Sequence, residues 1–266
     1  LWMSSATDSA GQPFHGRSFS PQPFAGDTGE ADPVLLAALE NFHALVPGVG
    51  TPAVEVLEAA WCSVVERLRS ARVLIPLIAQ AGDVGLTAEG KTVEKTQELS
   101  VIHVEGPDGR AVAPIFSSTE TMSAWNPQAR PIPVQAARAA LAAGADGLEL
   151  VVLDPGNKYS VVLRRSALSS IATGLPYIPP WSNPEVLGAI ANALLLASSD
   201  VVSHRVVPGD PGQQLAGPEV TVELALRPGL NGVELEAVVS SITTALSGSE
   251  IISAAADGMG LTILQA

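Results

Sequence analysis

Residues 175–183 constrain the fold most, because they carry three prolines and show neither a helical nor a strand period. Proline fixes its own φ angle and lacks a backbone donor, so helices and central strands do not continue through such a segment. The 266 residues also exceed the usual length of one compact domain. We therefore predict a Pro-rich linker at 175–183, between a domain at 32–174 and a smaller domain at 184–266.

Residues 1–31 are rich in Ser, Gly, Pro and Gln, and we predict an extended, partly disordered arm there. Several phenylalanines interrupt this composition, and large apolar side chains can anchor a segment that folds on binding. The predicted partner contacts in the arm are Arg17, Phe19, Pro21 and Phe24. The partner is the rest of the chain, a second copy or another protein, and the alternative is a solubilising tail.

Two helices open the first domain. Asp32 followed by Pro33 is an N-cap with proline at the first helical position, which predicts a helix over 34–45. Thr51 and Pro52 repeat that signal. The helix after them carries one apolar stripe at spacings of three and four, formed by Val54, Leu57, Trp61, Val64 and Leu68.

The pattern then changes to strands and short helices. The predicted strands are 73–79, 99–105, 110–116, 148–153 and 159–163, and the predicted helices are a short one capped by Ser118, 134–143 and 166–171. Turn residues at 106–109 and 154–157 indicate two hairpins.

The second domain repeats a helix followed by two strands. Its predicted elements are helix 184–198, strands 201–207 and 219–227, helix 232–246, and strands 250–255 and 260–265. Apolar and polar residues alternate along 219–227, which predicts one solvated face for that sheet. The fold class is therefore α/β (α+β), with N-terminal helices and a mixed sheet followed by a smaller αββαββ domain.

Charge and composition exclude several function classes. The 27 acidic residues outnumber the 14 basic ones, and no basic cluster is denser than Arg164 and Arg165, so we expect no nucleic-acid binding. No apolar stretch is long enough for a membrane span, and the N-terminus lacks the features of a secretory signal. The single Cys62 is interpreted as a packing residue and, with the missing signal, predicts a cytoplasmic protein.

No catalytic, cofactor-binding or metal-binding residue is predicted. The Gly-x-Gly-x-x-Ala pattern at 48–53 follows a helix, whereas dinucleotide binding needs a strand before it. The four histidines are scattered, with no pair at metal-binding spacing.

With these elements in place, the chain resembles the SseB family, whose N-terminal domain carries the enhanced-serine-sensitivity name, and in particular its actinobacterial full-length form. The strings that carry the resemblance are 72–76 (RVLIP), 114–118 (PIFSS) running to Trp125, 147–163, the arm at 17–27 and the ending at 257–261 (DGMGL). The resemblance implies an α/β domain followed by a second small domain, and it implies no particular activity.

Two function hypotheses remain. The first is a non-enzymatic protein-interaction or regulatory module, since catalytic patterns are missing and only 15% of the residues are charged, which leaves surface for a protein partner or self-association. The alternative is a small-molecule-binding protein or enzyme with an unknown ligand, because pockets often lie at strand ends and domain junctions. The residues predicted to form such a pocket are Phe116, Trp125, Asp154 and Asn157.

Overall fold

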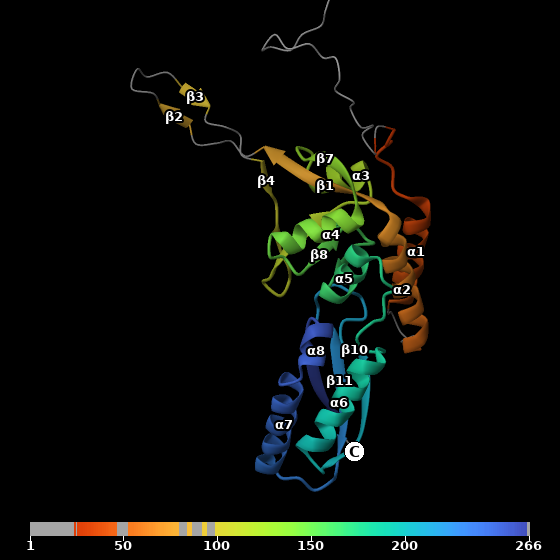
Figure 1. Cartoon of the computed structure of the whole chain (residues 1–266), viewed down its shortest axis with the longest axis vertical. Coiled ribbons are helices and arrows are strands. Elements are labelled where there is room, and N and C mark those ends of the chain that lie inside the picture. The colour runs from red at the N-terminus through yellow and green to blue at the C-terminus, as the bar shows by residue number, and fades with distance from the viewer. Residues whose placement is uncertain are drawn as a thin grey trace, which may run out of the picture.

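The computed structural model of the chain describes residues 24, 26–46, 53–79, 84–86, 92–94 and 99–264. Its elements fall into two groups along the longest axis of the molecule, residues 26–174 above and 184–264 below (Figure 1). Both groups combine helices with a sheet, which confirms the α/β class.

The first two helices are α1 (Pro33–Leu45) and α2 (Val54–Ser70). The predicted cap of α1 is confirmed, because an Asp32 carboxylate oxygen accepts from the backbone N–H groups of Val34 at 2.7 Å and Leu35 at 3.2 Å. The cap predicted for α2 is wrong. That helix begins after Ala53, which makes no side-chain cap bond, and Thr51 lies outside the described residues.

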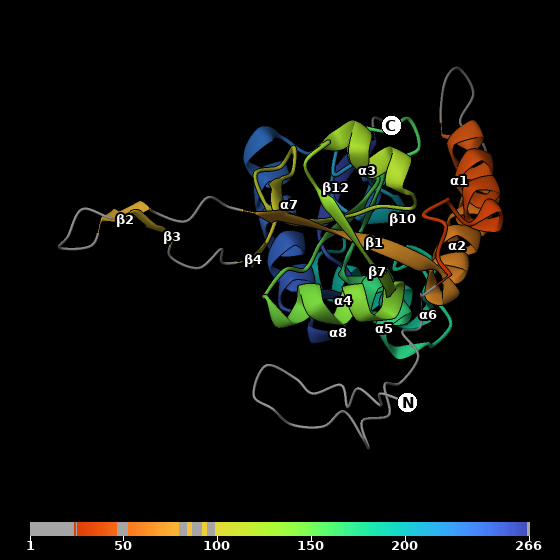
Figure 2. The same cartoon turned by 90° about the horizontal axis from the view of Figure 1, so that it is seen from above.

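The apolar stripe of α2 faces the core as expected. Trp61 is only 1% exposed and its ring lies 5.2 Å from the ring of Phe42 on α1, measured between centroids. Figure 2 shows the two helices side by side.

Strand β1 (Arg72–Ala79) is the middle of an antiparallel sheet between β4 (Leu99–Val101) and β7 (Arg130–Gln135). β7 was not predicted, because Pro131 and Pro133 break the strand pattern. Among the described strands it pairs with β1 alone. An edge strand tolerates proline because its outer side needs no donors for a ladder. Consequently α4 (Ala136–Ala145) begins two residues later than the predicted 134–143 helix.

A second sheet has the order β5 (Val104–Glu105), β6 (Ala111–Ile115), β8 (Val151–Leu153) and β9 (Val161–Leu163). The hairpin of β8 and β9 is confirmed. The first predicted hairpin is shorter than expected, because only β5 pairs with β6 while residues 99–101 pair with β1. The remaining elements of this part are β2 (Val84–Leu86), β3 (Thr92–Glu94), α3 (Thr119–Trp125) and α5 (Arg165–Thr173).

The lower part contains α6 (Pro184–Ala197), β10 (Val201–Pro208), β11 (Val220–Leu226), α7 (Gly232–Ser247), α8 (Glu250–Ala255) and β12 (Met259–Leu264). The predicted αββαββ order is wrong, since 250–255 is a helix and β12 pairs parallel to β11. Two adjacent isoleucines favour a strand locally, but the Ser249 side chain caps the helix by accepting from the backbone of Ile252. The predicted alternation along β11 is confirmed.

The two largest hydrophobic cores of the described residues lie mainly in one part each. One core joins α1, α2, α4 and α5 to the sheets, and the other packs α6 and α7 on one face of β11. Residues of the predicted linker pack on the first core, where Trp181 is 4% exposed and the Tyr177 hydroxyl accepts from the Trp61 indole at 3.2 Å. The domain boundaries themselves stay a prediction.

Candidate functional site

Phe116 and Trp125, two of the predicted pocket residues, pack against each other. Their ring centroids are 5.2 Å apart, and Phe116 is fully buried with Leu74 and Met122. Backbone hydrogen bonds between Leu74 and Phe116, at 2.8 and 2.9 Å, hold this cluster where β1 meets the end of β6. These two aromatic side chains therefore serve as packing residues in this structure.

Asp154 and Asn157, the other two, lie in the turn between β8 and β9. The buried Asp154 carboxylate accepts from the Ser117 backbone N–H at 2.8 Å, the Ser117 hydroxyl at 2.6 Å and the Thr121 hydroxyl at 2.6 Å. The Asn157 side chain accepts from the backbone of Tyr159 at 2.9 Å. Asp154 thus holds the start of α3 in place, and a ligand site at these residues stays a prediction.

Of the predicted arm contacts, Arg17, Phe19 and Pro21 lie outside the described residues, and Phe24 is half-buried in a turn. The chain that follows it docks on the first part. Its anchors are the Asp27 carboxylate, 2.9 Å from an Arg72 guanidinium nitrogen, and the Gly29 carbonyl, which accepts from the Thr119 backbone at 2.8 Å. Gly29 has a φ of 78°, and an added Cβ would lie 2.6 Å from a Thr119 carbon, so this contact requires glycine.

The sequence did not predict a network of charges between the two parts, formed by Arg110, Arg164, Asp210 and Asp257, in which Arg110 is partly exposed and the other three side chains are buried. We call it the charge network. Arg164, at the end of β9, contacts Asp257 at 2.8 Å and Asp210 at 2.7 Å, and donates to the Gly217 carbonyl at 2.8 Å. Arg110 holds both oxygens of the Asp257 carboxylate, at 2.7 and 2.9 Å. The side chains of Arg164, Asp210 and Asp257 are each 2% exposed.

The charge network determines the ionisation of Asp257. Burial alone would raise the pKa of this carboxyl, but hydrogen bonds from Arg110 and Arg164 outweigh that effect, so the pKa lies below its ordinary value. Asp257 therefore stays ionised at neutral pH and links the two arginines.

Glu219 lies beside the charge network and is itself buried. Its carboxylate accepts from the backbone of Asp257 at 2.7 Å and from the Ser166 hydroxyl. Burial raises the pKa of Glu219 above its ordinary value, despite those hydrogen bonds. Burial also raises the pKa of Tyr177, whose hydroxyl contacts Trp61.

The loop at 209–218, between β10 and β11, carries the lower half of this junction. Gln213 and Leu215 have left-handed φ angles of 52° and 57°, which cost roughly 1–2 kcal/mol each for residues other than glycine. Two hydrogen bonds of the loop offset this strain. The Asp210 carboxylate accepts from the Leu215 backbone N–H, and the Gln213 carbonyl accepts from the Val162 backbone N–H on β9, both at 2.7 Å. The Leu215 side chain packs in an upper-part cluster with Val112, Leu150, Val152 and Val162.

A different feature lies at the far end of α6. Its core stripe is Val186, Ile190 and Leu194, and the helical period then directs the next two leucines away from the core. Leu195 is 79% exposed, Leu196 is 85% exposed and the nearby Val202 on β10 is 68% exposed. We call these three residues the α6 surface.

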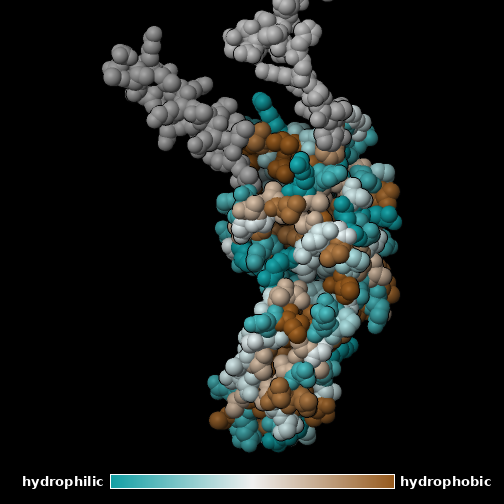
Figure 3. All heavy atoms as spheres, in the orientation of Figure 1, coloured by the Kyte–Doolittle hydropathy of each residue, from teal (hydrophilic) through white to brown (hydrophobic). Residues whose placement is uncertain are grey.

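Two members of the α6 surface, Leu195 on α6 and Val202 on β10, face a common space. Leu195 and Val202 line one hollow of about 440 Å³, whose other lining residues are small, apolar or serine, apart from His204. Figure 3 shows apolar atoms gathered at this lower end of the molecule, over the end of α6. Contiguous exposed apolar side chains are typical of interaction sites.

Two further observations concern other classes of site. Among the residues that the structure describes, no three His, Cys, Asp or Glu side chains lie where they could hold a metal ion. None of the described helices combines the length and the apolar character needed to cross a bilayer.

Comparison with known proteins identifies the family. No curated protein and no solved structure was found to match the chain. Residues 35–170, about half of the chain, match the SseB protein N-terminal domain, a range that runs from α1 to α5 and includes Arg110 and Arg164. The actinobacterial form stays a prediction, but the chain belongs to the SseB family.

Proposed function

We propose that this SseB family chain is a non-enzymatic protein-interaction module whose protein partner docks on the α6 surface. The observation that carries the proposal is the exposure of Leu195, Leu196 and Val202, three large apolar side chains within eight residues. None of them contributes to the core, so folding of this chain gives no reason for their apolar character.

The α6 surface can support a complex of moderate strength. Covering these three largely exposed side chains would contribute roughly 3–7 kcal/mol, at about 1.5–3 kcal/mol for each full burial. Association costs at least several kcal/mol in lost rigid-body freedom. We therefore expect a dissociation constant in the micromolar range or weaker, unless the partner contacts further residues.

The polar groups that could serve as general acids or bases support a non-enzymatic role. The carboxylates of Asp154, Glu219 and Asp257 are buried, and each accepts hydrogen bonds from the chain itself. Burial raises the pKa of the Cys62 thiol to about 11, with a further contribution from Glu58, so the thiol stays protonated and weakly nucleophilic. The single free Cys62 also supports our proposal of a cytoplasmic location.

The test compares a variant of the α6 surface with a matched control. Leu195→Gln combined with Leu196→Gln removes the exposed leucines, and Leu141→Gln combined with Leu175→Gln removes two leucines that are 59% and 64% exposed elsewhere. All four side chains lie largely outside the core, so we expect thermal midpoints close to that of the wild type. Sedimentation over concentrations up to about 100 µM measures self-association, and affinity capture from the source cells measures binding of other proteins.

We expect only the α6 variant to lose self-association, or the capture of one particular protein that then binds the purified chain directly. The proposal is wrong if the wild type is monomeric and the α6 variant captures the same proteins as the control. It is also wrong if both variants lose the interaction equally, because the partner would then bind through nonspecific hydrophobic contacts.

A further inference from the structure

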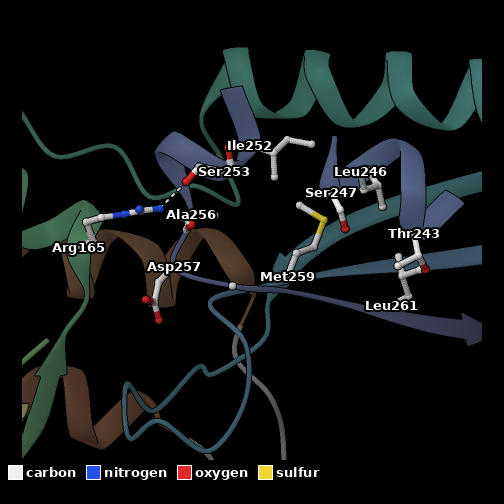
Figure 4. Close-up of a pocket in the computed structure, with 11 residues that line it drawn as sticks. Arg165, Thr243, Leu246, Ser247, Ile252, Ser253, Ala256, Asp257, Met259 and Leu261 are labelled. Carbon is white, nitrogen blue, oxygen red and sulfur yellow. Dashed lines mark hydrogen bonds between the residues drawn. The ribbon is translucent and has the colours of Figure 1, made fainter. Parts of the chain in front are cut away.

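A cavity of about 310 Å³ lies at the junction of the two parts, between the start of α5 and the elements α7, α8 and β12 (Figure 4). Its apolar lining includes Leu246, Ile252, Met259 and Leu261. This volume is at the lower end of the range for small-molecule sites, about 300–1,000 Å³. At roughly 30 Å³ per non-hydrogen atom, it has room for about ten such atoms.

Arg165 supplies a positive charge at one end of this cavity. One terminal guanidinium nitrogen, Nη2, donates to the carbonyls of Ser253 and Ala256, the latter at 2.8 Å, so the side chain is held against the end of α8. Figure 4 shows this contact, with Met259 and Leu261 further along the cavity. The other terminal nitrogen, Nη1, lies 3.8 Å from a carboxylate oxygen of Glu149, beyond hydrogen-bond distance.

The charges of the lining are unequally compensated. Asp257 and Arg165 are the charged residues among the described residues that line the cavity. The carboxylate of Asp257 is neutralised by Arg110 and Arg164. The side chains of Arg165 and its neighbour Glu149 are 38% and 61% exposed, so water weakens their attraction across 3.8 Å. The cavity therefore combines an apolar body with one partly exposed cation, Arg165, in its lining.

We propose that this cavity binds a small monocarboxylic acid with an aliphatic body of about eight carbons, its carboxylate on Arg165 and its chain along Met259 and Leu261. This site is independent of the α6 surface, and it differs from the pocket predicted near Phe116. Recognition depends on the local donor, because the net charge of −13 repels anions at long range. In 0.15 M salt that repulsion is screened beyond about 8 Å.

Methionine methyl groups report binding at this site in the full chain. Of the three methionines, Met259 lines the cavity, while Met122 is buried in the upper part and serves as an internal control. The experiment titrates octanoate into ¹³C-methyl-methionine-labelled protein in 0.15 M salt and follows both signals. We expect a saturable shift of Met259 with a dissociation constant on the order of 0.1–1 mM, and no shift of Met122.

Two comparisons test the role of the carboxylate and of Arg165. Octanamide keeps the chain but lacks the charge, and we expect it to bind at least about tenfold more weakly. Arg165→Gln should weaken octanoate binding by a similar factor, whereas Arg165→Lys should bind within a few-fold of the wild type because it keeps the cation. Unchanged Met122 shifts in both variants show that the core of the upper part is intact.

The proposal is overturned if Met259 shows no saturable shift with octanoate, or if octanamide binds as tightly as octanoate. It is also overturned if Arg165→Lys and Arg165→Gln lose binding equally with Met122 unchanged, because Arg165 would then act only by holding α8. None of these outcomes depends on the α6 surface, so they leave the proposed interaction function separately testable.

Discussion

Replacing Arg164 by methionine should weaken the fold more than any surface substitution, because this side chain neutralises two buried carboxylates. Its removal leaves Asp210 without the cation that contacts it, while Asp257 keeps Arg110. The Gly217 carbonyl also loses a donor at 2.8 Å. Breaking a buried ion pair by removing one partner costs about 3–5 kcal/mol, and we expect Arg164→Met to lower the free energy of unfolding by that amount.

Urea denaturation followed by two signals measures how far the free energy of unfolding falls. It also shows whether both parts of the molecule are destabilised. The described tryptophans, Trp61, Trp125 and Trp181, all precede α6, so fluorescence reports on the upper part, whereas far-ultraviolet circular dichroism reports on both. Because the charge network joins the two parts, we expect the two transitions to coincide in the wild type. In Arg164→Met both midpoints should fall.

Two further variants separate the buried charge from general effects. Arg227→Met removes an ion pair with Asp200 in which Arg227 is 49% exposed, and it should lower the urea midpoint far less than Arg164→Met does. Asp210→Asn in the Arg164→Met background should recover part of the loss, because it removes the carboxylate left unpaired. A cost below about 1 kcal/mol for Arg164→Met, or strictly additive effects in the double variant, would refute the reasoning.

Three other predictions concern single side chains. Trp61→Ala should lower the free energy of unfolding by about 3–5 kcal/mol in urea titrations, because the indole is 1% exposed and its loss leaves a cavity. Cys62 should react slowly with a thiol reagent at neutral pH, and its rate should rise as the pH approaches its pKa of about 11. The raised pKa of Glu219 means that the folded state binds its proton more tightly than the unfolded chain, so this group lowers stability as pH rises above the ordinary carboxyl range. Glu219→Gln should remove that component from the pH dependence of the urea midpoint, and an unchanged profile would contradict it.

Local patterns in the sequence predicted the elements that local interactions determine. The cap at Asp32 needs only a side chain and two neighbouring backbone groups, and the apolar stripe through Trp61 needs only the helical period. The alternation along 220–226 likewise follows from the two faces of a strand. In each case the residues that decide the structure lie within a few positions of one another.

The elements that the sequence missed depend on more distant contacts or on competing local signals. β7 pairs with β1 at sequence separations from 53 residues (Leu77–Arg130) to 63 residues (Arg72–Gln135). β7 lies at the edge of the described sheet, where two prolines are tolerated. At 250–255 the strand preference of two isoleucines competes with the cap at Ser249, and the cap prevails. The α6 surface was also missed, because three consecutive leucines fit a buried helix as well as an exposed one until the neighbours of the helix are known.

Two adjacent arginines at the start of α5 indicate from the sequence alone that acidic or carbonyl groups elsewhere must face this helix end. The acidic composition of the whole chain does not show this. Arg164 is the N-cap residue of α5 and Arg165 its first residue, yet cations are unfavourable at a helix N-terminus. Two adjacent arginines there require compensating groups from elsewhere in the fold. The structure supplies them from the lower part: Asp210 and Asp257 contact Arg164, and the carbonyls at the end of α8 accept from Arg165. The range matched by the family domain ends at residue 170, so it contains both arginines but neither carboxylate. We therefore expect a fragment limited to that range to have a lower urea midpoint than the full chain. In such a fragment Arg164 loses both of its carboxylate partners, and the core of the upper part loses its contacts with Val220 and Ala256.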